Sequence, residues 1–339
     1  MHEDSQKSYI ITILIILFLI IATIYISLTS GTFDMSIKDI FRTIFRVNPV
    51  SEYDLVIFHF RLPRIVIAGL VGVGLGISGA VIQGVTRNGL ADSGILGINA
   101  GAGAAIVFFM FFFHGNIGSN WLSIMSLPLF GLFGGLCASI LIYFFSFKDG
   151  KLDTSRLLLT GIAIGSAFGA FSLYLSLKMK STDFEMATVW ISGSIYDANW
   201  KYIISMLPWL IILIPIINKK AYLLDLFQLE ETSIKSLGVS VEKEKSILLL
   251  SSIGLVSACV SVSGSIGFVG LIAPHIAKRL VGINHKRVIP VCGAIGALLV
   301  LVSDFIARTV FSPAELPVGI VISIIGVPYF LYLLAKGKT

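Results

Sequence analysis

The sequence has unusually few charged side chains. Only 13% of its 339 residues are Asp, Glu, Lys or Arg, whereas soluble globular chains carry about 25%. The remaining charges form short clusters between long runs of the apolar residues that make up 56% of the chain. This segregation argues against a soluble domain and is typical of a chain that crosses a membrane several times. The net charge of +6 then reflects orientation in the membrane, and we expect no nucleic-acid partner.

Cysteine is also scarce. Cys137, Cys259 and Cys292 each lie inside an apolar run, without Cys-x-x-Cys spacing and without a nearby histidine. The pattern argues against a disulfide framework or a metal site, and it predicts three small, buried apolar side chains.

The middle of each predicted span lacks Asp, Glu, Lys and Arg. An ionisable group at that depth costs about 2.5–3.5 kcal/mol and usually belongs to a proton or ion path. One possible function of such a membrane protein is that of a stand-alone secondary transporter of a small solute. The absence of mid-membrane ionisable groups argues against this alternative. Asp304, near the outer end of a span, is expected to pair with Arg308 four residues later on the same helix.

No catalytic or nucleotide-binding pattern is visible either. The tail Gly337–Thr339 has the letters that end a P-loop, but Tyr332 stands where that pattern requires a glycine. We therefore expect that the chain is not an enzyme, and that any ATPase is a separate chain.

What the sequence does contain is ten apolar segments long enough, or nearly so, to cross a bilayer as helices. They predict one all-α transmembrane domain over residues 1–339.

The first segment could also be a secretory signal. Lys7 precedes it, but the segment exceeds the ~7–15 apolar residues of such a signal and is expected to be retained. Small residues four apart, such as Gly72 and Gly76, predict close helix packing. The predicted spans are about 9–28, 64–83, 93–113, 122–145, 155–177, 202–217, 246–262, 266–281, 288–306 and 318–334.

The basic residues predict the orientation of these spans. With the N-terminus inside, sixteen of the 25 Lys and Arg residues fall on the cytoplasmic side and nine outside. Because basic residues favour the cytoplasmic side, this distribution predicts that both termini are cytoplasmic and that the number of spans is even.

Several motifs, in a fixed order and spacing, resemble those of one transporter family. They are Arg61–Arg64, Gly79–Gly84, Asn88–Ala91, Gly94–Gly97, Thr154–Leu159, Gly264–His275, Ala314–Gly319 and Gly326–Pro328. From about Phe58 to Leu334 the chain resembles the FecCD-type, or vitamin B12 permease-like, permeases of ABC importers. These proteins take up iron–siderophores, haem or cobalamin.

The resemblance implies a ten-helix permease in a bacterial cytoplasmic membrane, surrounded by membrane lipid. It implies three kinds of protein partner: a second permease subunit, identical or related; two cytoplasmic ATPase subunits; and an extracytoplasmic substrate-binding protein. No cofactor is expected on this chain, since ATP and magnesium would bind the ATPases. The cargo stays open among siderophores, haem and cobalamin.

The resemblance also gives the external arginines a role. Arg61, Arg64 and Arg308 match positions at which a permease contacts glutamates of the binding protein. The planar guanidinium suits this task because it can hold a carboxylate through two hydrogen bonds. The alternative is that these arginines are interfacial anchors that reach to lipid headgroups.

A polar segment, about residues 225–245, is expected to face the cytoplasm. In the family this place forms short coupling helices that contact the ATPase. Glu231, Leu237 and Gly238 match the family pattern, whereas Glu230 and Ile234 replace the usual glycine and alanine. Without the resemblance the segment is a solvated loop in which Gly238 ends a helix.

Thr154 and Ser155 begin the fifth span at its cytoplasmic side. In the family the matching pair lies at the inner gate, where small hydroxyl side chains can line a constriction. The alternative is that they cap a helix start by accepting hydrogen bonds from backbone N–H groups.

Overall fold

The computed structural model describes residues 6–30, 35–47, 50–94, 96–113, 121–148, 151–312 and 314–336. Ile95, within one of the family motifs, and the tail 337–339 lie outside these residues. The regular secondary structure of the described residues is helical except for one short antiparallel pairing, of β1 (Phe147–Lys148) with β2 (Lys151–Leu152). The predicted all-α class is confirmed.

The helices that correspond to the ten predicted spans are joined by shorter ones. In chain order they are α1 (Gln6–Thr29), α2 (Ile37–Ile44), α3 (Ser51–Asp54), the π-helix η1 (Leu55–Arg61), α4 (Leu62–Thr86), α5 (Ile98–Phe113), α6 (Trp121–Phe145), α7 (Thr154–Ser176), α8 (Ser181–Ile191), α9 (Trp200–Lys219), α10 (Ala221–Leu226), α11 (Glu231–Ser236), α12 (Val241–Ser263), α13 (Val269–Val281), α14 (His285–Thr309) and α15 (Val318–Lys336).

Seven helical segments of the described chain are long and apolar enough to cross a membrane, and α5 and α15 are shorter apolar helices. The second predicted span is longer than expected, because α3, η1 and α4 form one continuous helical segment of 36 residues. The eighth is a half-length helix: the 13 residues of α13 span only about 20 Å at 1.5 Å per residue. The helices α2, α3 and α8 were not predicted from the sequence.

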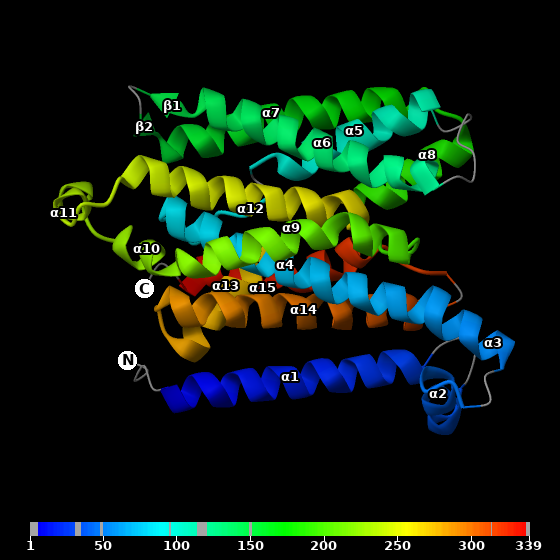
Figure 1. Ribbon diagram of the computed structural model, residues 1–339. Coiled ribbons are helices and arrows are strands. Elements are labelled where there is room, and N and C mark those ends of the chain that lie inside the picture. Colours follow the sequence, from blue (N-terminus) through cyan, green and yellow to red (C-terminus); the bar gives the residue numbers. More distant parts are fainter. Residues whose placement is uncertain are drawn as a thin grey trace.

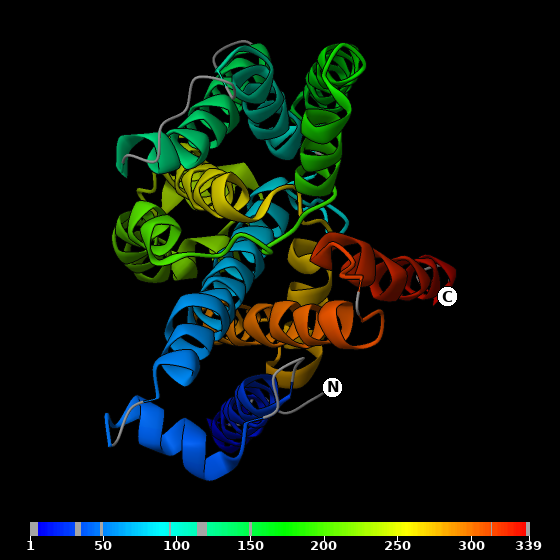
Figure 2. The same cartoon turned by 90° about the vertical axis from the view of Figure 1, so that its right-hand side faces the viewer.

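The long helices lie side by side, and α4 and α12 occupy the middle of the bundle (Figures 1 and 2). Within their most apolar windows, 78% of the segment that contains α4 and 83% of α12 is buried, against 11% for α1 and 17% for α7. The outer helices therefore expose apolar surface, as expected where lipid or another membrane subunit covers them.

Glycines allow α4 to pack directly against its neighbours. A Cβ atom added at Gly72 would lie 2.3 Å from the Gly296 carbonyl oxygen of α14, and one added at Gly79 would lie 2.1 Å from the Gly270 carbonyl oxygen of α13. Only glycine fits such backbone contacts. The close packing predicted from the small residues at four-residue spacing is thus present between α4 and α14.

The bundle has two distinct ends (Figure 1). One, which we call the coupling end, holds α10 and α11 together with the start of α1 and the end of α15. The other, which we call the arginine end, holds α2, α3 and the last turn of α14.

Candidate functional site

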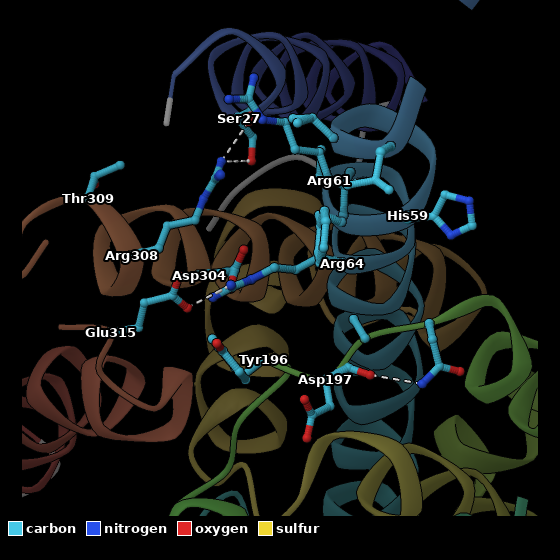
Figure 3. Close-up of a pocket in the computed structure, with 16 residues that line it drawn as sticks. Ser27, His59, Arg61, Arg64, Tyr196, Asp197, Asp304, Arg308, Thr309 and Glu315 are labelled. Atoms are coloured by element: carbon cyan, nitrogen blue, oxygen red, sulfur yellow. Dashed lines mark hydrogen bonds and ion pairs between the residues drawn. The ribbon is translucent and has the colours of Figure 1, made fainter. Parts of the chain in front are cut away.

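The three arginines predicted to dock a binding protein surround one cavity of about 850 Å³ at the arginine end (Figure 3). Arg61 ends η1, Arg64 lies in the first turn of α4, and Arg308 lies in the last turn of α14. The fold thus brings together residues almost 250 positions apart in the sequence. The other polar residues that line the cavity are Ser27, His59, Tyr196, Asp197, Asn199, Asp304, Thr309 and Glu315.

Arg64 is held by two carboxylates. Its Nε lies 2.8 Å from Oδ1 of Asp304, and its Nη1 lies 2.7 Å from Oε2 of Glu315. The predicted pairing of Asp304 with Arg308 is therefore wrong. Asp304 lies on the side of α14 that faces α4, whereas Arg308 extends toward α1 (Figure 3). Asp304 does pair with an arginine, but that arginine is Arg64 of α4 and not Arg308.

Arg61 and Arg308 instead contact the last turn of α1. Arg308 Nη2 donates to the Ser27 carbonyl oxygen at 2.7 Å and to its Oγ at 2.5 Å, and Arg61 donates to the Leu28 carbonyl oxygen. Carbonyl groups at a helix end lack partners within the helix and carry a partial negative charge, which a cation stabilises. The sequence reading missed this role, since nothing in the sequence near Ser27 indicates a partner.

The predicted coupling residues lie around α11. Glu231 is the first residue of this helix, and its Oε1 lies 3.1 Å from Lys245 Nζ on α12. Leu237 follows the helix with 63% of its surface exposed. Gly238 has a φ of +78° and donates its N–H to the Lys235 carbonyl oxygen, so it ends α11 as its sequence position suggested.

The segment is fastened to the spans on both sides. Asp225 of α10 accepts from the His285 backbone N–H at 3.1 Å and lies 2.5 Å from its Nδ1, at the start of α14. Arg87, at the end of α4, donates to the Leu229 carbonyl oxygen just before α11. These contacts tie α10 to the start of α14, and the residue before α11 to the end of α4.

Thr154 and Ser155 are the first two residues of α7, and Ser155 is exposed. They do not cap this helix as the alternative held, because Asp153 occupies the N-cap position and its side chain accepts from the Arg156 backbone N–H at 3.0 Å. Their place at an inner gate stays a prediction from the family resemblance.

One buried acid was missed. Asp92 lies in the connection between α4 and α5, outside the spanning helices, with only 8% of its surface exposed. Desolvation raises the pKa of its carboxyl group, and hydrogen bonds from the backbone N–H groups of Ser93 and Phe268 oppose that change. Phe268, which adopts a φ of +65°, is the N-cap residue of α13. No role was predicted for Asp92 from the sequence.

A helical bundle that crosses the membrane many times, with a fastened polar segment at one end and an arginine-lined cavity at the other, defines a multi-pass transport permease. One solved structure, of a metal-chelate type ABC transporter in an inward-facing conformation, matches 95% of this chain and 97% of its own with a TM-score of 0.80 and 31% sequence identity.

The chain belongs to the FecCD transport family, whose model matches residues 18–336. It is 53% identical, over 94% of this chain and 96% of the relative, to the iron-uptake system permease protein FeuC of Bacillus subtilis. It is also 43% identical, over the full length of both chains, to the iron(3+)-hydroxamate import system permease protein FhuG of the same organism. The chain is thus a permease subunit of a bacterial ABC importer, located in the membrane.

Proposed function

We propose that this permease imports a ferric siderophore or a similar iron chelate. The observation that carries the proposal is the 53% identity, over nearly the whole chain, to an iron-uptake permease. The match to a metal-chelate type transporter supports the same class of cargo. We expect the permease to bind a large chelate weakly along its path, because a tight binding site in the membrane would prevent release of the chelate.

We further propose that ATP and magnesium act on two separate ATPase subunits that dock on α10 and α11, which places the coupling end in the cytoplasm. An exposed Leu237 beside the Glu231–Lys245 pair offers an apolar contact framed by charge. Because Asp225 and Arg87 fasten the segment to α14 and α4, a rigid-body movement of the ATPases would reach the spans. A second permease subunit would complete the pathway, with Thr154 and Ser155 at its inner gate.

For the binding-protein contact, the geometry favours Arg308 over Arg64. The charge of Arg64 is already balanced by Asp304 and Glu315. Arg308 donates to the neutral oxygens of Ser27 and lies over the ring of Phe305, and among the described residues no carboxylate lies within ion-pair distance of it. Arg61 is 7% exposed and donates to the Leu28 carbonyl oxygen. A glutamate of a binding protein would therefore gain most from Arg308.

The test is uptake of radiolabelled ferric siderophores by cells in which this chain is deleted and then restored. We expect uptake to be lost on deletion, to return with the wild-type chain, and not to return with Arg61→Glu/Arg308→Glu at equal membrane expression. Lys180→Glu, at an exposed basic residue predicted on the same side, is the matched control and is expected to restore uptake. Uptake that survives deletion of the chain, with no redundant importer present, would overturn the proposed cargo.

The same cells distinguish an ABC permease from the alternative, a secondary transporter. Inactivating the partner ATPase should abolish uptake if the chain works as an ABC permease. Uptake that continues without the ATPase and responds to the proton gradient would favour the alternative.

A further inference from the structure

The short helix α2 lies across the direction of the spans. In Figure 1 the long helices run along the page while α2 is seen nearly end-on, and in Figure 2, turned by 90°, α2 is seen along its length. Since the spans run along the membrane normal, the axis of α2 is close to the plane of the membrane. It lies at the arginine end, directly after α1.

The two sides of α2 differ sharply. Ile40 and Thr43 are buried, and Ile40 packs with Met35 and Ile57 in a small core next to η1. The neighbouring face, which adjoins Ile40, carries four exposed, large apolar side chains. They are Ile37, Phe41, Ile44 and Phe45. Phe41 and Phe45 are 57% and 68% exposed and stack with parallel rings.

Two cations border this apolar side. On a helix with 3.6 residues per turn, Lys38 and Arg42 fall at one edge of the arc formed by the four apolar residues. Both side chains are exposed, and among the described residues neither has an ion-pair partner. An apolar arc with basic residues along its edge is the pattern of a helix that lies in a membrane interface, where the long basic side chains reach to the headgroups.

The conformation of α2 is fixed by its capped ends together with the packing of Ile40 against Met35 and Ile57. Ser36 and Asp39 form a capping box at its start. Arg46, with a φ of +57°, ends it, and Val47 donates its N–H to the Arg42 carbonyl oxygen at 2.8 Å. The exposed apolar side is therefore a preformed surface.

We propose that α2 is an interfacial helix that binds phospholipid of the leaflet at the arginine end. Ile37, Phe41, Ile44 and Phe45 enter the acyl-chain boundary, and Lys38 and Arg42 hold phosphate groups of the headgroups. This contact fixes the height of the arginine-lined cavity above the membrane. The link is direct, because Arg46 pairs with Asp54 of α3 and lies over the ring of Phe58 in η1, the helix that ends at Arg61.

The test uses the full chain in lipid nanodiscs with a genetically encoded fluorescent amino acid at position 41, which leaves the native cysteines in place. The matched control carries the same amino acid at position 52, an exposed residue of α3 at the same end of the bundle. Brominated acyl chains are expected to quench position 41 several-fold more than position 52, and a water-soluble quencher is expected to show the reverse order. Equal quenching at both positions would overturn the proposal.

The headgroup contact has its own readout. Replacing phosphatidylcholine with phosphatidylglycerol is expected to deepen the quenching at position 41, and Lys38→Gln/Arg42→Gln is expected to abolish that lipid dependence. The measurement is then repeated with the assembled importer and its binding protein. If quenching by lipid disappears on assembly, the apolar side of α2 belongs to a protein interface and the lipid assignment is wrong. If it persists, the assignment stands.

Discussion

Arg64 and Asp304, 240 positions apart in the sequence, form an ion pair that joins α4 to α14 at the arginine end. The Nε–Oδ1 distance is 2.8 Å, and the Asp304 side chain is 3% exposed. Removing one partner of a buried pair costs about 3–5 kcal/mol when the other charge is left without compensation, and here the partly exposed Glu315 offsets only part of the Arg64 charge. We therefore expect Asp304→Asn to lower the melting temperature of the purified chain strongly.

Glu315→Gln is the matched control for this prediction. It removes the second carboxylate from the same guanidinium, but the Glu315 side chain is 33% exposed. Ion pairs near the surface contribute about 0–1 kcal/mol, so this variant should melt close to the wild type. If both variants lowered the melting temperature equally, burial would not determine how much each carboxylate stabilises its ion pair with Arg64.

A second prediction concerns the contact of α4 with α14. Gly72→Ala should severely destabilise the chain, because the added Cβ would lie 2.3 Å from the Gly296 carbonyl oxygen and force the two helix backbones apart. Gly69→Ala, one turn earlier on the same helix, meets nothing within 4 Å, and should be neutral or slightly stabilising since alanine favours helix. Melting curves in detergent and the amount of folded chain in membranes compare the two. A stable Gly72→Ala chain would contradict the close packing.

The contact with the ATPase gives a third prediction. Leu237→Asp changes a side chain that is 63% exposed, so folding should be unaffected. If Leu237 is an apolar contact of the coupling segment, the variant should lose the ATPase during purification of the complex through a tag on the permease.

Ile234 provides the comparison, because it is fully buried in the same segment. Ile234→Ala should destabilise the segment itself, by about 2–5 kcal/mol if the site cannot collapse, and should therefore increase local proteolysis as well as ATPase loss. An ATPase that stays bound to Leu237→Asp would remove this residue from the interface.

The features that could be predicted from the sequence are those with a local signal. Apolar runs located the seven segments long enough to cross a membrane and the shorter helices α5, α13 and α15. Gly238 ends α11 as its position suggested. The gathering of Arg61, Arg64 and Arg308 around one cavity agrees with their common predicted side of the membrane. The resemblance to a family added the roles expected for these residues, which composition alone does not indicate.

What could not be predicted depends on contacts between distant segments. The spacing of Asp304 and Arg308 favours a pair within one helix, yet the carboxylate faces α4 and meets Arg64. The burial of Asp92 arises from the packing of α13 against a connection that reads as a turn. The apolar and basic residues of α2 do have amphipathic spacing in the sequence. An eight-residue helix inside a polar stretch is too short, however, for this periodicity to predict a helix.

The last prediction concerns the pH dependence of stability at Asp92. Burial raises the pKa of this carboxyl group above its ordinary value, which is about 3.9 in an unfolded chain. The folded state therefore binds the proton more tightly than the unfolded state. The stabilisation is fully present below about pH 3.9 and is lost as the pH rises through the raised pKa. Asp92→Asn keeps a neutral polar group of the same shape, so its melting temperature should decline less than that of the wild type between acidic and neutral pH.

Asp92→Leu separates this effect from simple packing. It removes the oxygen atoms that accept from the backbone N–H groups of Ser93 and Phe268, and unsatisfied buried N–H groups cost about 1–3 kcal/mol. The leucine variant should therefore be less stable than Asp92→Asn at every pH. A wild-type chain whose melting temperature rises steadily toward neutral pH, with Asp92→Asn abolishing that rise, would mean that the ionised carboxylate is the form that the folded chain prefers.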